Sequence, residues 1–94
     1  MATIDRVAVI DVGILTITRR AFQQIQEDDL FDCFFRHMAG DWGEVDDEDR
    51  RANDKALETG RRILSAYTDR HGSHFWIITE ADRSATTILL PEEY

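Results

Sequence analysis

The C-terminal part of the chain reads Phe75-Trp-Ile-Ile-Thr-Glu-Ala-Asp-Arg-Ser-Ala-Thr-Thr-Ile-Leu-Leu-Pro91. Residues 75–79 and 85–90 are rich in β-branched and apolar side chains, which strands favour, and residues 80–84 supply turn formers. The pattern predicts a hairpin whose second strand stops at Pro91, because proline has no N–H for a ladder. Both runs are nearly continuous, so we expect one face of each strand in the core and the other at least partly covered.

Two further strands are predicted on the N-terminal side of this hairpin. Residues 61–67 form one, joined to residues 75–79 by a turn around Gly72, so that three consecutive strands make an antiparallel meander. Residues 7–17 are predicted to form a strand that Gly13 interrupts, either as a bulge in one bent strand, which we favour, or as a tight turn between two short strands. We expect this first strand to join an edge of the meander or to lie beside the last strand.

Three helices are predicted between the first strand and the meander. Thr18 fits the N-cap of a helix over residues 19–26, and the acids at 27–29 suit the positive end of a second helix that ends before Gly40. Asp46 caps a third helix that runs to about residue 59 and ends at Gly60. The chain is therefore expected to be one α+β domain over residues 1–94, in two layers, with the order strand-helix-helix-helix-strand-strand-strand and an antiparallel sheet whose helices pack on one face.

The second and third helices differ in their apolar faces. The second carries the richest one, which we interpret as core docked on the sheet: Leu30, Phe31, Phe34, Phe35 and Met38. The third has a thin stripe of Ala52, Ala56 and Leu57, so we expect it to face solvent. Cys33 reads as a small buried hydrophobe on the second helix.

Composition narrows the class of protein. The chain has 94 residues, 43% of them apolar and 32% charged, which is typical of a globular domain. No apolar run is long enough to span a membrane, and the N-terminus lacks the layout of a signal peptide. A single cysteine cannot form an internal disulfide, and no motif calls for a cofactor. We expect a cytoplasmic protein without cofactors.

Charge bears on the kind of partner. The formal net charge is −8, which argues against direct binding to nucleic acid. From Asp41 to Glu58 there are eight acids against three bases. Such a local excess on a protruding helix could imitate phosphates and dock in the groove of a basic, nucleic-acid-binding protein, although helix capping alone also explains acids at helix starts.

Several motifs resemble those of a known group of proteins: Arg36-His37, Gly40-Asp41-Trp42-Gly43, Asp49, Asn53, Leu64-Ser65-Ala66-Tyr67, Trp76-Ile-Ile-Thr-Glu-Ala-Asp-Arg-Ser84 and Thr86-Thr-Ile-Leu-Leu-Pro-Glu-Glu-Tyr94. The chain resembles, over roughly residues 13–94, a family of short bacterial proteins of mobile elements, often labelled plasmid-related. Some members carry a type I restriction-system label. The resemblance implies a setting in which many small acidic proteins inhibit host defence, and it implies no chemistry.

No motif for phosphate binding or for a nucleophile elbow is present. Asp69, His71 and His74 lie near one turn, which is weak evidence for a metal, and we predict none. His37, at the end of the second helix, could meet Glu80 and Arg83 of the hairpin turn and form a metal-free ribonuclease site. In the plainer interpretation, Glu80, Asp82 and Arg83 build the turn and pair with Arg36 or with the loop of Asp41.

We therefore expect a non-enzymatic, protein-binding inhibitor of a bacterial defence system that targets nucleic acid, of the anti-CRISPR or anti-restriction type. The residues expected to contact the partner are Asp41, Trp42, Glu44, Asp46, Asp47, Glu48 and Asp49. Trp42 either folds back onto the core or anchors the partner at the surface. The alternatives are a ribonuclease-like toxin that uses His37, Glu80 and Arg83, and a structural homodimer built by pairing sheet edges.

Overall fold

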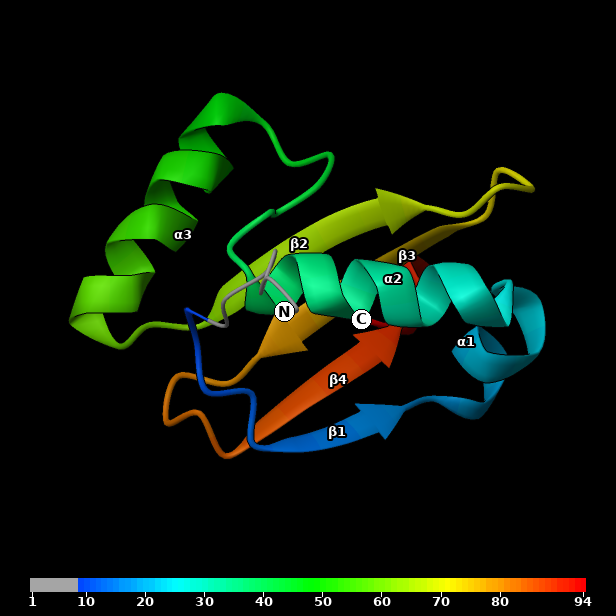
Figure 1. Cartoon of the computed structure of the whole chain (residues 1–94), viewed down its shortest axis with the longest axis horizontal. Helices are drawn as coiled ribbons and strands as arrows, with labels where there is room; N and C mark the ends of the chain where they lie inside the picture. The colour runs from blue at the N-terminus through cyan, green and yellow to red at the C-terminus, as the bar shows by residue number, and fades with distance from the viewer. Residues whose placement is uncertain (1–8) are drawn as a thin grey trace, which may run out of the picture.

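A four-stranded sheet forms one layer of the fold, and the three α-helices pack on one side of it (Figure 1). The computed structural model describes residues 9–94. The strands are β1 (Ile14–Ile17), β2 (Ile63–Thr68), β3 (His74–Thr79) and β4 (Ala85–Leu89), in the order β1-β4-β3-β2. The α+β fold class, the order of elements and the antiparallel meander are confirmed.

The first strand lies beside the last strand and runs parallel to it. The N–H of Ile14 donates to the carbonyl of Ser84, and the N–H of Thr18 donates to that of Ile88. The sheet is thus mixed, and the prediction of a purely antiparallel sheet is wrong on this point. Local pattern predicts a strand but not its direction, which depends on how the intervening helices return the chain to the sheet.

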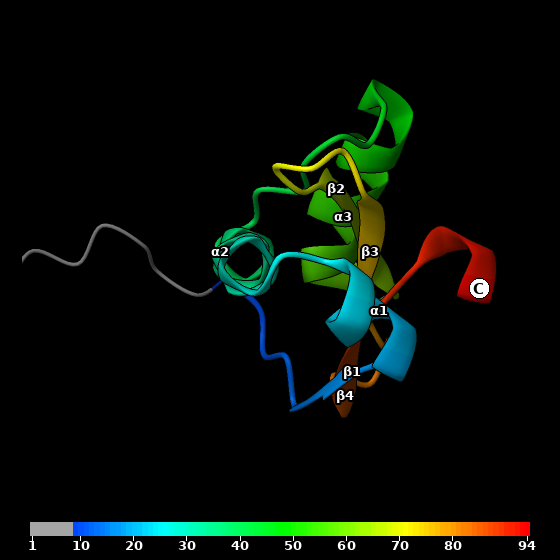
Figure 2. The same ribbon diagram turned by 90° about the vertical axis from the view of Figure 1, so that its right-hand side faces the viewer.

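The core lies between α2 (Glu27–Met38) and one face of the sheet (Figure 2). The antiparallel register places Tyr67 opposite Phe75 and Ser65 opposite Ile77, and it continues through Ile88 of β4. Leu30, Cys33 and Phe34 of α2 are buried against this face. Burial of Cys33 agrees with its interpretation as a small core residue.

The first strand is shorter than predicted. Of the predicted strand over residues 7–17, only Ile14–Ile17 is a strand, and residues 7 and 8 lie outside the described part. Gly13 has a φ of +62°, and a Cβ at this position would collide with the backbone of Ser84. This glycine therefore sets where β1 begins and how closely the chain approaches the β3–β4 turn.

The helix termini follow the predicted caps. In α1 (Arg19–Gln24) the Thr18 hydroxyl accepts from the N–H of Ala21, and in α3 (Asp47–Thr59) the Asp46 carboxylate accepts from the N–H of Asp49. Gly60 closes α3 in the left-handed conformation. The cap of α2 was not predicted, because it is the side chain of Gln26, which accepts from the N–H of Asp29.

The side of α3 that faces the protein differs from the predicted one. Asn53 and Ala56 are its buried residues, whereas Ala52 and Leu57 are exposed. The predicted stripe of Ala52, Ala56 and Leu57 is therefore correct only at Ala56. A polar residue supplies the second contact, so apolar periodicity pointed to a neighbouring face of the helix.

The edge of the sheet at β2 is covered, in contrast to the edge at β1. The N–H of Ala66 donates to the carbonyl of Trp42, and the carbonyl of Ala66 accepts from the N–H of Glu44. The side chain of Asn53 binds both backbone groups of Leu64. Within the described residues, no element lies beyond β1 in Figure 1.

A short 3₁₀ helix, η1 (Pro91–Glu93), follows β4 on the side of the sheet opposite α2 (Figure 2). The ring of Tyr94 lies edge-on to Trp76, with 5.6 Å between centroids. Across residues 9–94, none of the helices combines the length and the apolar character that a bilayer crossing requires.

Candidate protein-binding surface

His37 is fully buried in the middle of the molecule. Its Nδ1 lies 2.6 Å from Oγ of Ser65, and its Nε2 lies 2.8 Å from Oγ1 of Thr79. The hydroxyl of Thr79 binds that of Thr86 at 2.7 Å, and Thr86 donates to the carbonyl of Val12. This chain of hydrogen bonds holds the imidazole between α2 and the sheet, away from solvent.

Burial also determines the charge of His37. Removal from water, with a smaller contribution from the positive charge of Arg83, lowers the pKa of His37 to about 4. The ring is therefore neutral at neutral pH, which matches hydroxyl partners on both nitrogens. The edge of the ring also contacts Trp42, with 5.7 Å between the ring centroids.

The ribonuclease-like cluster of His37, Glu80 and Arg83 is not assembled. The guanidinium of Arg83 donates to the carbonyls of Ala56, Arg61 and Glu80, at 2.9, 2.7 and 3.2 Å. Arg83 thus ties the β3–β4 turn to the C-terminal end of α3. Glu80 contributes backbone groups to this turn, and its side chain is exposed. The plainer interpretation of a turn-building role holds for Arg83, although its partners are carbonyls and not the Asp41 loop.

Trp42 is buried, with 3% of its surface exposed. Its indole N–H donates to the carboxylate of Asp54 at 2.8 Å, and it packs with Ile10, Ala56 and Ile63 in a second core cluster. Its expected role as a contact residue for a partner is therefore wrong, because the side chain is turned into the protein. The alternative, that Trp42 folds back onto the core, is confirmed.

Asp41 and Glu44 are exposed, but both carboxylates take part in holding the loop between α2 and α3. Asp41 accepts from the Arg36 guanidinium at 2.8 Å and from the N–H of Gly43. Glu44 accepts from the hydroxyl of Thr68. The carbonyl of Asp41 also accepts from the hydroxyl of Tyr67. These bonds give Asp41 and Glu44 a structural role in the loop. Few hydrogen-bonding groups of Asp41 are left for contact with a partner.

The start of α3 is the exposed part of the predicted contact region. Asp46 caps the helix and Asp47 pairs with Arg50 at 2.6 Å, while Glu48 and Asp49 are also exposed. In an exposed i, i+3 pair the Coulomb gain is small, so Asp47 and Arg50 contribute little to stability. The sequence prediction thus located four acids at the surface correctly, and their role remains a proposal.

The outward face of α2 carries the exposed aromatic residues that sequence reasoning placed in the core. Phe31 and Phe35 are 38% and 49% exposed, in one row four residues apart. Asp28 and Asp32 are exposed and lie three residues before each of them, so they flank the row. The prediction that the whole apolar stripe packs on the sheet is wrong for these two phenylalanines, because Cys33 and His37 occupy the inward face instead.

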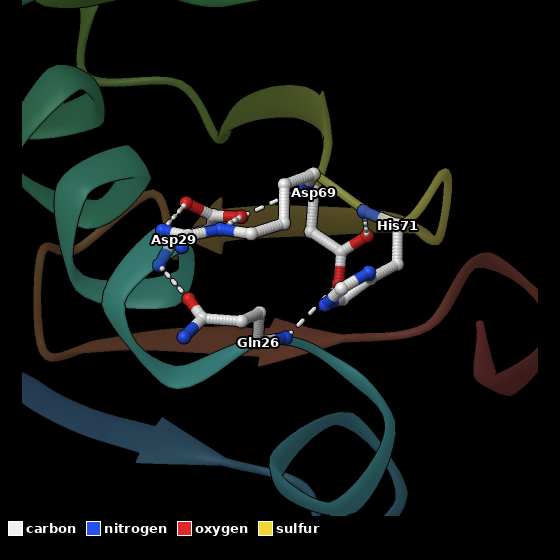
Figure 3. Close-up of polar contacts among 5 residues, drawn as sticks. Gln26, Asp29, Asp69 and His71 are labelled. Atoms are coloured by element: carbon white, nitrogen blue, oxygen red, sulfur yellow. Dashed lines mark hydrogen bonds and ion pairs between the residues drawn. The ribbon is translucent and has the colours of Figure 1, made fainter.

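The N-terminal end of α2 is fastened to the β2–β3 turn through two carboxylates (Figure 3). Burial would raise the pKa of Asp69, but N–H groups of Gln26, Ser73 and His71 bind its carboxylate and lower it. The hydrogen bonds from the Arg70 side chain and N–H lower the pKa of Asp29 to about 2. These contacts fix the direction of α2 and hence the direction in which Phe31 and Phe35 point.

A shallow depression of about 440 Å³ lies beside this joint, lined by Asp29, Asp32, Cys33, Arg36, Thr68, Asp69 and Arg70. Among its charged residues, Asp29 is paired with Arg70 and Arg36 with Asp41, and the carboxylate of Asp69 accepts from backbone N–H groups. No three His, Cys, Asp or Glu residues between positions 9 and 94 are grouped in a way that could hold a metal ion.

No protein-family model, curated protein or solved structure matches this chain.

Proposed function

We propose that this chain is a small acidic protein-binding domain without catalytic activity, which inhibits a bacterial defence complex that targets nucleic acid. The observation that carries the proposal is the outward face of α2, where Phe31 and Phe35 are exposed beside Asp28 and Asp32. The partner is a basic, nucleic-acid-binding protein of the CRISPR or restriction type, and the proposed place of action is the cytoplasm.

The chemistry of the α2 face supports a protein partner. Exposed aromatic side chains in a row at helical spacing are what a helix presents when it binds in an apolar groove. Aromatic residues also carry much of the binding free energy in protein interfaces. Leu30, Cys33 and Phe34 fill the core on the inward face of α2. The exposed side chains of Phe31 and Phe35 are therefore available to bind a partner.

The negative charges near the α2 face support a partner whose groove has a basic rim. Asp28 and Asp32 lie next to the phenylalanines, and the neighbouring Glu27 is exposed as well. The acids Asp46 to Asp49 at the start of α3 add a second negative region. With a net charge of −8, the field of the domain should speed association with a positively charged surface at low salt.

The setting of the defence complex comes from the resemblance to short mobile-element proteins. A protein that must compete with nucleic acid for a basic surface gains from being acidic, whereas a ribonuclease must attract a polyanion. The alternative catalytic cluster would need the imidazole of His37. In the structure this imidazole is enclosed by Ser65, Thr79 and Trp42.

The test is restriction of an incoming plasmid in cells that carry a type I restriction system, with and without this protein, and in matched cells that carry a CRISPR–Cas complex. We expect the protein to raise transformation by the targeted plasmid in one of the two settings. The double variants F31A/F35A and D28N/D32N should lose the effect. Failure of the protein to protect the plasmid in both settings would overturn the inhibitor proposal.

Matched controls separate the α2 face from general changes of surface. Leu57 is 37% exposed on α3, so L57A removes a comparable apolar surface and should keep full protection. E58Q removes one exposed charge of α3 and should also keep it. The variant D46N/D47N/E48Q/D49N keeps a competent N-cap, because Asn caps as well as Asp, and should weaken protection only partly. Equal loss in L57A and F31A/F35A would remove the α2 face from the proposal.

A further inference from the structure

Among residues 9–94, the open edge of the sheet is strand β1. The N–H of Ile14 donates to Ser84 and the N–H of Thr18 donates to Ile88, so alternate residues of this stretch bind β4. Since backbone groups of successive strand residues point to opposite sides, the N–H and C=O of Leu15 and Ile17 point away from β4. They form a row of donors and acceptors at the free edge.

This edge lacks the devices that normally prevent sheets from joining. Ile-Leu-Thr-Ile contains no charge and no proline, and Ile14 is 73% exposed. The opposite edge is closed by the Trp42–Glu44 segment and by Asn53. Of the two edges formed by residues 9–94, β1 is therefore the one whose backbone groups are available for pairing.

We propose that β1 pairs with β1 of a second copy of this chain, antiparallel, about a two-fold axis at Thr16. The two four-stranded sheets then form one continuous sheet. This interface uses a different surface from the outward face of α2, and it holds whether or not the domain inhibits a defence complex.

The backbone conformation selects the register. An axis at Leu15 would place Ile17 opposite Gly13, whose φ of +62° cannot continue a strand. An axis at Ile17 would place Leu15 opposite Arg19, which is already in α1. An axis at Thr16 uses only residues 14–18, since Thr18 is still extended with φ −65° and ψ 153°. Leu15 and Ile17 then exchange hydrogen bonds with Ile17 and Leu15 of the other copy.

The side chains of this register match. On the side of α2, half-buried Leu15 lies opposite half-buried Ile17 of the other copy, so two apolar pairs extend the core layer. On the far side, Thr16 lies opposite itself in a pair of threonines, and exposed Ile14 lies opposite Thr18. The pairing covers an apolar side chain that is otherwise in water.

Charge complementarity favours a second copy over an unrelated strand. Exposed Asp11 precedes β1 and exposed Arg19 follows it. Antiparallel pairing brings Asp11 of one copy towards Arg19 of the other at both ends of the interface, whereas parallel pairing would bring like charges together. Arg20 contributes less, because it pairs with Glu92 of its own chain at 3.4 Å.

Sedimentation equilibrium tests the association. We expect a species of twice the 10.9 kDa chain mass. T16K places two lysines at the axis and should give a monomer with unchanged circular dichroism, while L57K on α3 stays dimeric. If T16K does not fold, I14K replaces it in this experiment, because Ile14 is 73% exposed and a lysine there should fold and also prevent the pairing. A monomeric wild type at every concentration, or a dimer that withstands these substitutions, overturns the proposal.

Cross-linking tests the register. Directly opposite residues in a non-hydrogen-bonded pair have Cα atoms about 4.5 Å apart, within the range for a disulfide. T16C should therefore form a covalent dimer on mild oxidation. I14C should not, because two copies of residue 14 lie four residues apart along the strands in this register, which is about 14 Å at 3.4 Å per residue. The native Cys33 is buried and does not compete. Cross-linking of I14C but not T16C contradicts the register.

Charge exchange tests the orientation. D11R and R19D should each dissociate the dimer, and an equimolar mixture of the two variants should form a heterodimer, in which every facing pair has opposite charges. A mixture that stays monomeric, with both variants folded, contradicts the antiparallel arrangement.

Discussion

The carboxamide of Asn53 binds both backbone groups of Leu64: its Oδ1 accepts from the N–H at 3.3 Å and its Nδ2 donates to the carbonyl at 2.8 Å. One side chain thereby takes the place of a neighbouring strand at this position of β2. It also fastens α3, whose apolar contact with the rest of the protein is limited to small residues such as Ala56. The position of α3, and with it the acidic start of that helix, depends on this pair.

Replacing Asn53 by Ala should lower the free energy of unfolding by about 1–3 kcal/mol, because two backbone groups of Leu64 lose their partner. Urea denaturation followed by circular dichroism measures the change. The matched control is A52S on the exposed neighbouring position, which should stay within about 0.5 kcal/mol of wild type. An unchanged midpoint for N53A would show that water replaces the carboxamide without loss.

Arg83 should be a structural residue, and its replacement should destabilise the contact between the β3–β4 turn and the C-terminal end of α3. R83A removes three hydrogen bonds to carbonyls and also places a Cβ-bearing residue without compensating contacts at φ +62°. We expect destabilisation of about 1.5–3 kcal/mol, as for hydrogen bonds to charged groups. R83G keeps the backbone conformation at no steric cost, so it should be less destabilised than R83A. Equal unfolding free energies for R83A and R83G would contradict the role of the positive φ.

Stability should fall in mild acid because of His37. Its pKa is about 4 in the folded protein and about 6.5 in the unfolded chain, so the unfolded state binds more protons between these values. The contribution of His37 is fully present above pH 6.5 and is lost as the pH falls towards 4. The shift corresponds to about 3 kcal/mol at most.

The measurement is urea unfolding at a series of pH values from 7 to 4.5. H37Q keeps a polar side chain but does not titrate, so its loss of stability over this range should be clearly smaller than that of wild type. H37Q is less stable than wild type at pH 7, because Ser65 and Thr79 lose their imidazole partner. Parallel pH profiles for the two proteins would exclude His37 as the titrating group.

Fluorescence should report that Trp42 is inside the protein. In W76F the remaining indole, Trp42, is 3% exposed and bonded to Asp54, so acrylamide should quench it poorly. In W42F the remaining Trp76 is only half-buried and should be quenched more strongly. Binding of a partner at the α2 face should leave the Trp42 signal nearly unchanged. Strong quenching in W76F would show that Trp42 is exposed to solvent and would contradict its burial.

The features that sequence pattern predicted correctly are those with local causes. The caps at Thr18 and Asp46 and the left-handed glycine at position 60 each depend on a few neighbouring residues. The same holds for the hairpin between β3 and β4, where turn formers separate two runs of strand formers. Among the expected contact residues, the acids that begin α3 were placed at the surface correctly because charged helix starts are rarely buried.

Besides the direction and length of β1, the predictions that failed concern which side of an element faces the core. Phe31 and Phe35 were placed inside because they extend the apolar stripe of α2, but this stripe is wider than the sheet can cover. The sequence left open whether Trp42 folds back onto the core, and it offered His37 for an alternative catalytic cluster. In the structure, hydroxyls of Ser65 and Thr79 and the carboxylate of Asp54 give their polar atoms partners inside the protein. Those partners come from distant parts of the chain, so no local sequence pattern predicts them.

By itself, the sequence determined the number, order and approximate limits of the helices and of the meander strands, because capping, turn formation and strand preference act over a few residues. Tertiary structure alone decided that β1 runs parallel to β4, that His37 is enclosed and neutral, and that two phenylalanines of α2 face water. These outcomes follow from how the layers pack, where each side chain competes with others for a limited apolar face and each buried polar atom must find a partner.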